Sequence, residues 1–391
     1  MTTLATINAL VNDRRRDTSS NTIDMTGDGF RAINSALDIW SSLHDWPWTI
    51  KTSNFNYNAN IDKYALNSIA SDFKSPLTVK PFKKDSKDRE LWMVSQLKFD
   101  SATTKPNRFA IANENGIQYL RCKANLGTWT NIHSSTAYDD NGTWVGATAI
   151  SNVGTDQYEG FDLPASVKFD YSGTSGTLTN STFSALDLSA FKNRSNLYFD
   201  VYIPESTNLT GFTLKWGSSN ANYYQVTSTT NYVGETFSDG WNRIKFAWSS
   251  PTVVGTPVDT EIDYLQVTVS YSVDPALTDF RIQNFFISEN IPLTVTYYST
   301  NMAFDVSGAV QVPQFNDAAD TTDYPLWAGR WDTVTEQFVT SVLEIIFFMT
   351  GEYADMSISR SKIQEIVEPL KARYPSQVRY PATFITSDIN L

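Results

Sequence analysis

The sequence predicts an α+β multidomain protein, in which a helical bundle formed by both chain ends accompanies a small β-module and an inserted antiparallel β-sandwich. Three observations predict this class. With 391 residues, the chain is long enough for two or three domains. Helical spacing of apolar residues is confined to the two ends of the chain. Between the ends, 18% charged and 14% aromatic residues form a composition typical of β-rich proteins.

Residues 1–54 are expected to form two helices of the bundle. Apolar residues recur there every three or four positions. They are Leu4, Ile7, Leu10 and Val11 in the first helix, and Phe30, Ile33, Leu37, Trp40 and His44 in the second. Pro47 ends the second helix because proline cannot continue the hydrogen-bond ladder. His44 continues the apolar stripe, so we expect a core or boundary residue rather than a ligand.

Three consecutive arginines, Arg14, Arg15 and Arg16, follow the first helix. Cations in the last turn suit the negative end of the helix dipole, which is the structural interpretation. The functional interpretation is a contact with an acidic partner. Both remain open at this point.

Residues 326–375 are expected to supply the other helices of the bundle. Residues 333–350 are apolar around most of the helix circumference, which predicts a central helix. A last helix follows Gly351. The tail of residues 376–391 is apolar, has no helical period, and is expected to be docked rather than free. Its expected docking residues are Tyr380, Phe384 and Ile385.

Everything between the helices has β character. Residues 55–126 plus 291–325 contain short alternating runs and are expected to form the small β-module. Residues 127–290 are rich in Gly, Ser, Thr and Asn, with turn signals every 8–12 residues, which predicts the β-sandwich. Its expected strands are 166–171, 197–203, 211–216, 222–229, 241–247, 262–271 and 279–287.

Charge is unevenly distributed along this acidic chain of net charge −12. Residues 56–126 carry a net charge of +5, whereas residues 127–290 carry −10. An acidic chain is not a general nucleic-acid binder, because phosphate binding needs clustered cations. The local exception is the stretch with Lys80, Lys83, Lys84, Lys87 and Arg89. A solvated loop between strands is the simpler interpretation, and a contact surface is the alternative.

Most enzyme classes lack support. Neither His44 nor His133 lies in a catalytic motif, and the single cysteine, Cys122, excludes an intramolecular disulfide and a Cys-rich zinc site. No carboxylate pair is singled out for glycoside hydrolysis. We therefore expect no enzymatic activity. The sequence also shows no secretory signal, and its longest strongly apolar run, 342–349, is far below the ~20 residues of a membrane span.

The two flanks follow a recognisable order. After the first two helices come Trp46-Pro47-Trp48, Tyr64-Ala65-Leu66, Leu91-Trp92-Met93-Val94, Pro106-Asn107-Arg108-Phe109-Ala110-Ile111 and Ile117-Gln118-Tyr119-Leu120. The chain returns with Leu293-Thr294-Val295-Thr296-Tyr297-Tyr298 and the C-terminal helices. Over residues 1–126 and 291–391 this order resembles the head-to-tail adaptor proteins of tailed bacteriophages, also called connector or tail tubular proteins.

This resemblance implies a structural virion protein of the phage neck, assembled in the host cytoplasm. It would form a closed ring of twelve copies that joins the portal protein to the tail nozzle or tail tube. Double-stranded DNA would pass through its lumen without specific binding, since an acidic wall repels DNA. The arginine triplet would then contact a neighbouring subunit or the portal, the C-terminal tail would dock on the portal, and the Lys80–Arg89 stretch would face the channel or a partner.

The insert resembles a second family. Leu197-Tyr198-Phe199-Asp200-Val201-Tyr202-Ile203, Gly240-Trp241-Asn242-Arg243-Ile244 and Asp279-Phe280-Arg281-Ile282 are similar to segments of galactose-binding-like and carbohydrate-binding-module jelly rolls. The resemblance implies a jelly roll, sometimes with a structural calcium ion. Asp139-Asp140-Asn141-Gly142 lacks most of a calcium-loop motif, so we expect a tight turn there.

Sugar binding is the sharper hypothesis for this insert, because sugars are held by flat aromatic faces with polar neighbours. Trp216, Tyr223 and Tyr224 are the candidate glycan platform, and Trp241 and Trp248 are further aromatic candidates. Strand alternation sends one of the two adjacent tyrosines inward and the other outward. The chain would then be a glycan-binding host-recognition protein or a distal tail or baseplate component. A purely structural insert is the other interpretation.

Overall fold

The computed structural model describes residues 2–15, 27–81, 91–100, 107–154, 165–171, 173–275, 279–305, 310–315, 323–328 and 332–376. The chain forms two compact units. Unit 1 contains residues 1–54, 70–80 and 294–391, and unit 2 contains residues 55–69 and 81–293. The segments expected as one small β-module, 55–126 plus 291–325, therefore fall in both units.

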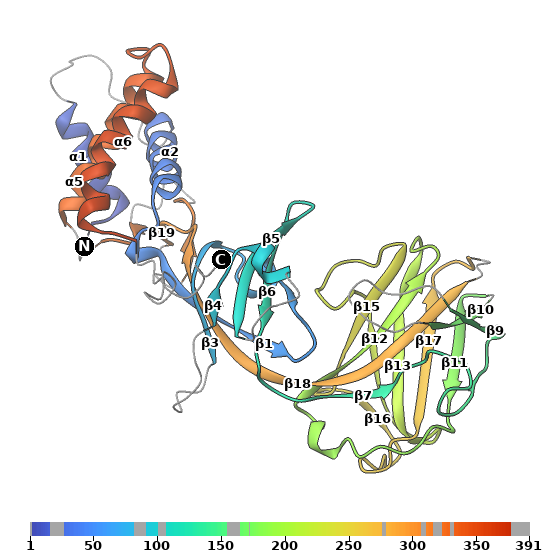
Figure 1. The fold of residues 1–391 in the computed structure, drawn as a ribbon. Coiled ribbons are helices and arrows are strands. Elements are labelled where there is room, and N and C mark those ends of the chain that lie inside the picture. The colour runs from blue at the N-terminus through green and yellow to red at the C-terminus, as the bar shows by residue number, and fades with distance from the viewer. Residues whose placement is uncertain are drawn as a thin grey trace, which may run out of the picture. The chain divides into compact units, whose positions relative to one another are not determined.

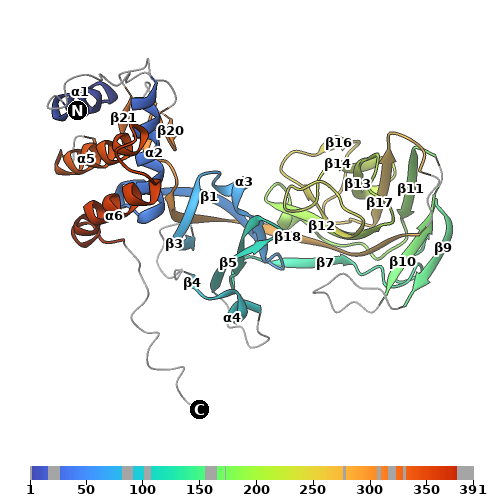
Figure 2. The same cartoon turned by 90° about the horizontal axis from the view of Figure 1, so that it is seen from above.

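Helices from both ends of the chain pack together in unit 1 (Figures 1 and 2). They are α1 Leu4–Arg14, α2 Asp28–Leu43, α5 Asp332–Met349 and α6 Met356–Arg373. As expected for a central helix, α5 packs against the other three. The core contains Trp40, whose ring stacks on Trp46 and Trp327 at centroid distances of 5.4 and 5.6 Å. The Trp40 Nε1–H donates to Ser341 Oγ at 3.0 Å, so this indole is also satisfied in the core.

Short elements complete unit 1. They are the 3₁₀ turn η1 Pro47–Thr49, the strand β3 Phe73–Pro81, and the strands β19 Ala303–Phe304, β20 Gln311–Val312 and β21 Tyr324–Pro325, which pair in the order β20-β19-β21. Asp72 accepts hydrogen bonds from Lys51, Tyr297 and Ser299. Burial acts to raise the pKa of the Asp72 carboxyl, but these donors lower it below its usual value.

Unit 2 begins with a small sheet of four strands in the order β2-β6-β5-β4. Its elements are β2 Lys63–Ala65, α3 Leu66–Ile69, β4 Trp92–Met93, α4 Gln96–Asp100, β5 Arg108–Glu114 and β6 Ile117–Lys123. The strand β1 Ile50–Asn58 leads into it from unit 1. Cys122 of β6 is fully buried, and this burial raises the pKa of its thiol well above the ordinary value. The thiol is therefore protonated and unreactive at neutral pH.

The rest of unit 2 is an antiparallel β-sandwich, as the sequence predicts. One sheet has the strand order β15-β12-β18-β10-β9, and β7 also pairs with β18. The long strand β18 continues into unit 1, and β1 and the unit 1 strand β3 pair with it as well. The bounds are β15 Gly240–Ala247, β12 Ser195–Ile203, β18 Phe280–Ser299, β10 Ser166–Asp170, β9 Thr148–Val153 and β7 Trp129–His133. The second sheet has the order β16-β14-β13-β17-β11-β8. Its bounds are β16 Thr252–Val254, β14 Asn222–Ser228, β13 Leu209–Ser219, β17 Tyr264–Tyr271, β11 Ser175–Asn180 and β8 Trp144–Val145. The 3₁₀ turn η2 Ser189–Phe191 precedes β12.

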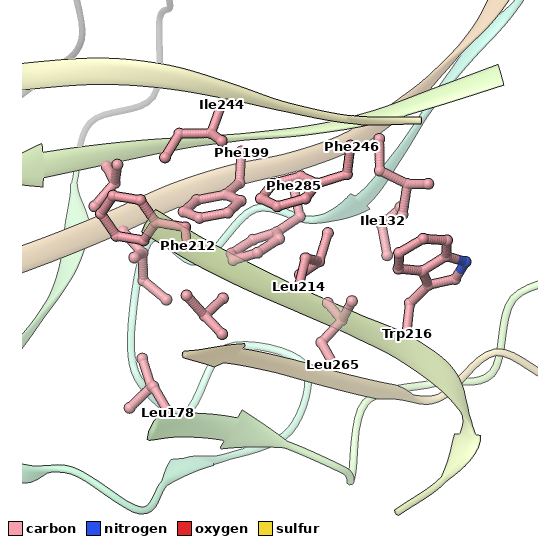
Figure 3. Packing of buried hydrophobic residues seen from close by; sticks show 14 of the residues in the cluster. Ile132, Leu178, Phe199, Phe212, Leu214, Trp216, Ile244, Phe246, Leu265 and Phe285 are labelled. Carbon is pink, nitrogen blue, oxygen red and sulfur yellow. The ribbon is translucent and has the colours of Figure 1, made fainter. Parts of the chain in front are cut away.

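Alternation along each strand explains the core of the sandwich (Figure 3). In β12, every second side chain from Leu197 to Ile203 points between the sheets and is buried. The Phe199 ring stacks on Phe246 and Phe285 at centroid distances of 5.5 and 5.0 Å. All seven strands expected in the insert are present, and β18 is longer than expected, since the run expected at 294–298 is the end of the same strand.

Candidate functional site

Two of the three predicted platform residues, Trp216 and Tyr224, are core residues, so that prediction is wrong. Both side chains are buried, with Trp216 0% and Tyr224 3% exposed. They meet Trp248 in one aromatic cluster, with centroid distances of 5.3–5.8 Å. The Tyr224 hydroxyl donates to Asp259 Oδ1 at 2.6 Å. Neither ring is available to a sugar.

Tyr223 lies on the outer face of the same sheet, as alternation along β14 predicts. Its register partner on β13 is Gly217, which in turn pairs with Tyr264 of β17. The Lys215 ammonium lies 4.6 Å from the centroid of the Tyr223 ring. The pair Trp216–Tyr224 and the residue Tyr223 thus face opposite sides of the sheet, and no common platform exists.

A different group of side chains gathers on the outer face of the other sheet. Register aligns Trp241 of β15, Tyr202 of β12, Arg281 of β18 and Lys168 of β10 in one row across four strands. The inward-facing neighbours of these residues belong to the core, so the row itself points away from it. All four residues are partly exposed. We call these residues the aromatic–cation row.

The geometry of the row is fixed by contacts among its own members. Trp241 and Tyr202 meet edge to face, with centroids 5.8 Å apart and an interplanar angle of 71°. The Arg281 guanidinium carbon lies 4.7 Å from the Tyr202 ring centroid. Asp279 accepts from Arg281 Nε at 2.9 Å and from its Nη2 at 2.6 Å, and its Oδ1 lies 3.6 Å from the Lys168 ammonium. The bidentate pair therefore holds the guanidinium in one plane beside the Tyr202 ring.

A buried ion pair lies next to the row on the same face. The Arg243 Nε and Nη2 atoms donate to the two Asp200 oxygens at 2.7 and 2.8 Å, and Asn284 Nδ2 donates to Asp200 Oδ2 at 3.0 Å. The Asp200 side chain is 0% exposed and that of Arg243 is 5% exposed. Further along, Tyr198 and Phe286 are covered by Ile61, Tyr64 and Tyr232. The ion pair and this apolar cover support the row from one side.

Both histidines make polar contacts within the protein. His133 is buried; its Nδ1 accepts from the Ser135 N–H at 3.0 Å, and its Nε2 faces the Asn141 carbonyl at 3.1 Å. Burial lowers the pKa of His133 below its ordinary value. His44 lies at the C-terminal end of α2, and its Nε2 is 2.8 Å from the Tyr374 carbonyl oxygen. This confirms the expected boundary position.

The segment Asp139-Asp140-Asn141-Gly142 forms a turn, as predicted. Asn141 and Gly142 both have positive φ, and the Asn141 side chain accepts from the Ser184 N–H at 3.0 Å. Within the described residues, no group of three or more His, Cys, Asp or Glu side chains could hold a metal ion. A structural calcium ion stays a prediction. In the part of the chain that the structure describes, no helix is long and apolar enough to cross a membrane.

The remaining predicted contact residues are mostly unplaced. Arg14 forms an ion pair with Glu336 of α5 and donates to Thr340 Oγ1 at 3.1 Å. It therefore links α1 to α5 within its own chain. Arg15 is partly exposed at the end of α1, and Lys80 is exposed on β3. The other members of these predicted groups lie outside the described residues; they are Arg16, Lys83, Lys84, Lys87, Arg89, Tyr380, Phe384 and Ile385.

Unit 1 contains a polar cavity of about 520 Å³, which is an alternative site. It is lined by residues that include Lys51, Asp72, Asn301 and Gln311. The Asp72 carboxylate is already occupied by donors from the protein, including Asn301 Nδ2 at 3.1 Å. The cavity therefore offers a ligand fewer available polar groups than the aromatic–cation row does.

Sequence reasoning named Trp241 as an available aromatic but missed Tyr202, Arg281 and Lys168. A signal for Tyr202 was present, since Tyr198, Asp200 and Tyr202 alternate with apolar residues and must share the outer face of β12. The approach of Arg281 and Lys168 depends on the register of three strands. That register is not readable from one sequence.

Comparison with known proteins gives similarities to solved structures, whereas no family model and no curated protein matches the chain. The chain is similar to the family 30 carbohydrate-binding module of a cellulosomal cellulase from Clostridium thermocellum, with 14% identity over 41% of this chain and 98% of that chain, at a TM-score of 0.30. It is also similar to CBM27-1 of Caldicellulosiruptor saccharolyticus in complex with mannohexaose, with 12% identity over 41% and 96% of the two chains, at a TM-score of 0.27. A third similarity is to the enzymatically active domain of tailspike protein 4 of bacteriophage CBA120, with 12% identity over 42% and 19%, at a TM-score of 0.20.

Proposed function

We propose that the β-sandwich binds a glycan through the aromatic–cation row. The observation that supports this most directly is the meeting of Trp241 and Tyr202 on the outer face of the sheet, beside a guanidinium that Asp279 holds in place. Aromatic rings offer flat apolar surface to the C–H faces of a sugar. Adjacent charged groups form hydrogen bonds with its hydroxyls.

Each member of the row has a distinct part in this binding. The Trp241 and Tyr202 rings would carry one sugar unit. Arg281 is already oriented by Asp279, so little side-chain entropy is lost when it donates to the ligand. Lys168, only loosely paired at 3.6 Å, would turn toward a hydroxyl further along the row. Binding therefore would not require the sheet to rearrange.

Two tyrosine variants of the full chain test this proposal. Tyr202→Ala should weaken binding on a glycan panel at least tenfold, because it removes a ring and the support of Arg281. Tyr223→Ala is the matched control, since it removes an outward tyrosine from the opposite sheet. Equal effects of the two variants, or glycan binding that depends on Tyr223 alone, would place the site elsewhere and contradict the proposal.

A second candidate function is the head-to-tail adaptor of a tailed bacteriophage, and a specific observation favours it. Residues from α1, α2, α5 and α6 share one hydrophobic cluster, so both chain ends build one helical body, which is the arrangement that the resemblance of the flanks implies. We propose a ring-forming neck protein that binds the portal. In that case, the sandwich would be an insert exposed on the neck.

Mass photometry tests the adaptor proposal. The purified chain, measured alone and then mixed with the portal ring of the same virion, should add about one copy per portal subunit. A variant that ends at residue 376 should lose this association if the tail docks as the sequence predicts. No association of the complete chain with the portal would refute the adaptor function and leave glycan binding untouched.

A further inference from the structure

Lys245 lies on the face that carries the aromatic–cation row and has no counter-ion among the residues that the structure describes. Trp241, Arg243 and Lys245 occupy alternate positions of β15 and point to the same side of the sheet. Arg243 is paired with Asp200, and Lys168 and Arg281 are paired with Asp279. No residue of the described ranges forms a hydrogen bond or ion pair with the Lys245 ammonium.

The surroundings of this ammonium remove part of its hydration. The Lys245 residue is exposed to solvent, but the protein atoms around it lower the pKa of its amine by desolvation. Its neighbour across the strand pair is Tyr198, which is buried beneath Ile61 and the partly buried Tyr64 and Tyr232. A cation placed there loses part of its hydration and gains no counter-ion from the described part of the chain. An anionic group bound to the ammonium would compensate for that loss.

The distance between Lys245 and Trp241 sets the length that a ligand needs in order to contact both residues. They are four residue steps apart on an extended strand, so their Cα atoms are about 13 Å apart. A short stretch of glycan can span this distance, with a sugar ring at one end and a charged substituent at the other. The paired Arg243 lies between the two ends and is not available to an anion.

We propose that this face selects acidic glycans, and that Lys245 binds a carboxylate or sulfate group of a sugar chain whose other end stacks on Trp241 and Tyr202. This inference rests on the proposed glycan binding. The net charge of −10 over residues 127–290 opposes it only weakly. At physiological salt the Debye length is about 8 Å, so exposed carboxylates further away are largely screened and the adjacent ammonium dominates.

Matched pairs of polysaccharides separate charge from shape. Affinity electrophoresis of the full chain would use polygalacturonate against its fully methyl-esterified form, and dextran sulfate against dextran. The acidic member of at least one pair should bind about tenfold more tightly, the size expected of one hydrogen-bonded charge pair. The pair that responds identifies whether the group is a carboxylate or a sulfate.

Three lysine variants assign the effect to one side chain. Lys245→Ala should remove the preference for the acidic member without abolishing binding of the neutral one, and Lys245→Arg should retain the preference. Lys215→Ala, which removes a lysine from the opposite sheet, should change nothing. Equal binding of both members of each pair, or a preference that survives Lys245→Ala, would overturn the inference and leave the proposed glycan binding standing. Failure of the complete chain to bind any glycan, acidic or neutral, would overturn both.

Discussion

Replacement of Arg243 by methionine should destabilise the sandwich by about 3–5 kcal/mol, the cost of breaking a buried ion pair from one side. The structure explains this size. The substitution removes two short hydrogen bonds to Asp200, at 2.7 and 2.8 Å, and leaves a carboxylate with 0% exposure. Among the described residues, only the Asn284 amide at 3.0 Å would still donate to it. One neutral donor cannot replace the lost charge and its two bonds.

The double variant Asp200→Leu/Arg243→Met isolates the cost of the unpaired charge. It removes both ions and fills the space with apolar atoms, so it should recover most of the lost stability. Hydrogen exchange measured by mass spectrometry is the suitable assay, because peptides from β12 and β15 report on the sandwich alone. The single variant should exchange about 100-fold faster or more in these peptides, since each 1.4 kcal/mol corresponds to a factor of ten.

Two results would refute this reasoning. If Arg243→Met changed the exchange of β12 and β15 less than tenfold, the carboxylate would not depend on its partner as the burial implies. If the double variant were as unstable as the single one, packing of the long arginine side chain would be the cause, rather than an uncompensated charge.

The remaining predictions concern three further positions. Because burial lowers the folded-state pKa of His133 below 6.5, the sandwich should lose stability as the pH falls from about 6.5 to that lowered pKa, and thermal unfolding of His133→Gln should lack this loss. Gly217→Val should destabilise the sandwich by about 1–3 kcal/mol, because its Cβ would lie 2.2 Å from the backbone carbonyl oxygen of Asn222. Gly154→Val is the control, since its Cβ would lie in open space, and it should leave the melting temperature unchanged. Cys122 should resist alkylation at pH 8 until urea is added, and labelling of the native chain would contradict its burial.

The strands of the sandwich could be predicted from sequence because local signals agree there. In β13, the apolar residues Phe212, Leu214 and Trp216 alternate with polar residues and glycine. This pattern predicts both the strand and the face of it that is buried. The same pattern already places Trp216 in the core. Treating its ring as a sugar platform gave weight to residue type over alternation, and the structure corrects that choice.

The candidate site was less predictable because it is made by register. Tyr202 and Trp241 are 39 positions apart in the sequence, and Arg281 comes 40 positions later still. They meet only because β12 pairs with both β15 and β18 at particular residues. Shifting either pair by one residue would turn one partner to the core side. No local property of a single strand fixes that alignment.

The two ends of the inserted segment are joined by hydrogen bonds between their strands. β7, with which the chain enters the sandwich, pairs with β18, with which it leaves, and the Glu289 N–H donates to the Thr128 carbonyl at 3.0 Å. Entry and exit therefore lie on adjacent strands, so a single short turn could close the gap that removal of the segment would leave. Recombination at these two points of the gene could exchange one sandwich for another without changing the sequence on either side. Under the proposed glycan binding, a new ligand preference would then be acquired in a single genetic event, rather than through successive point mutations on a fixed surface.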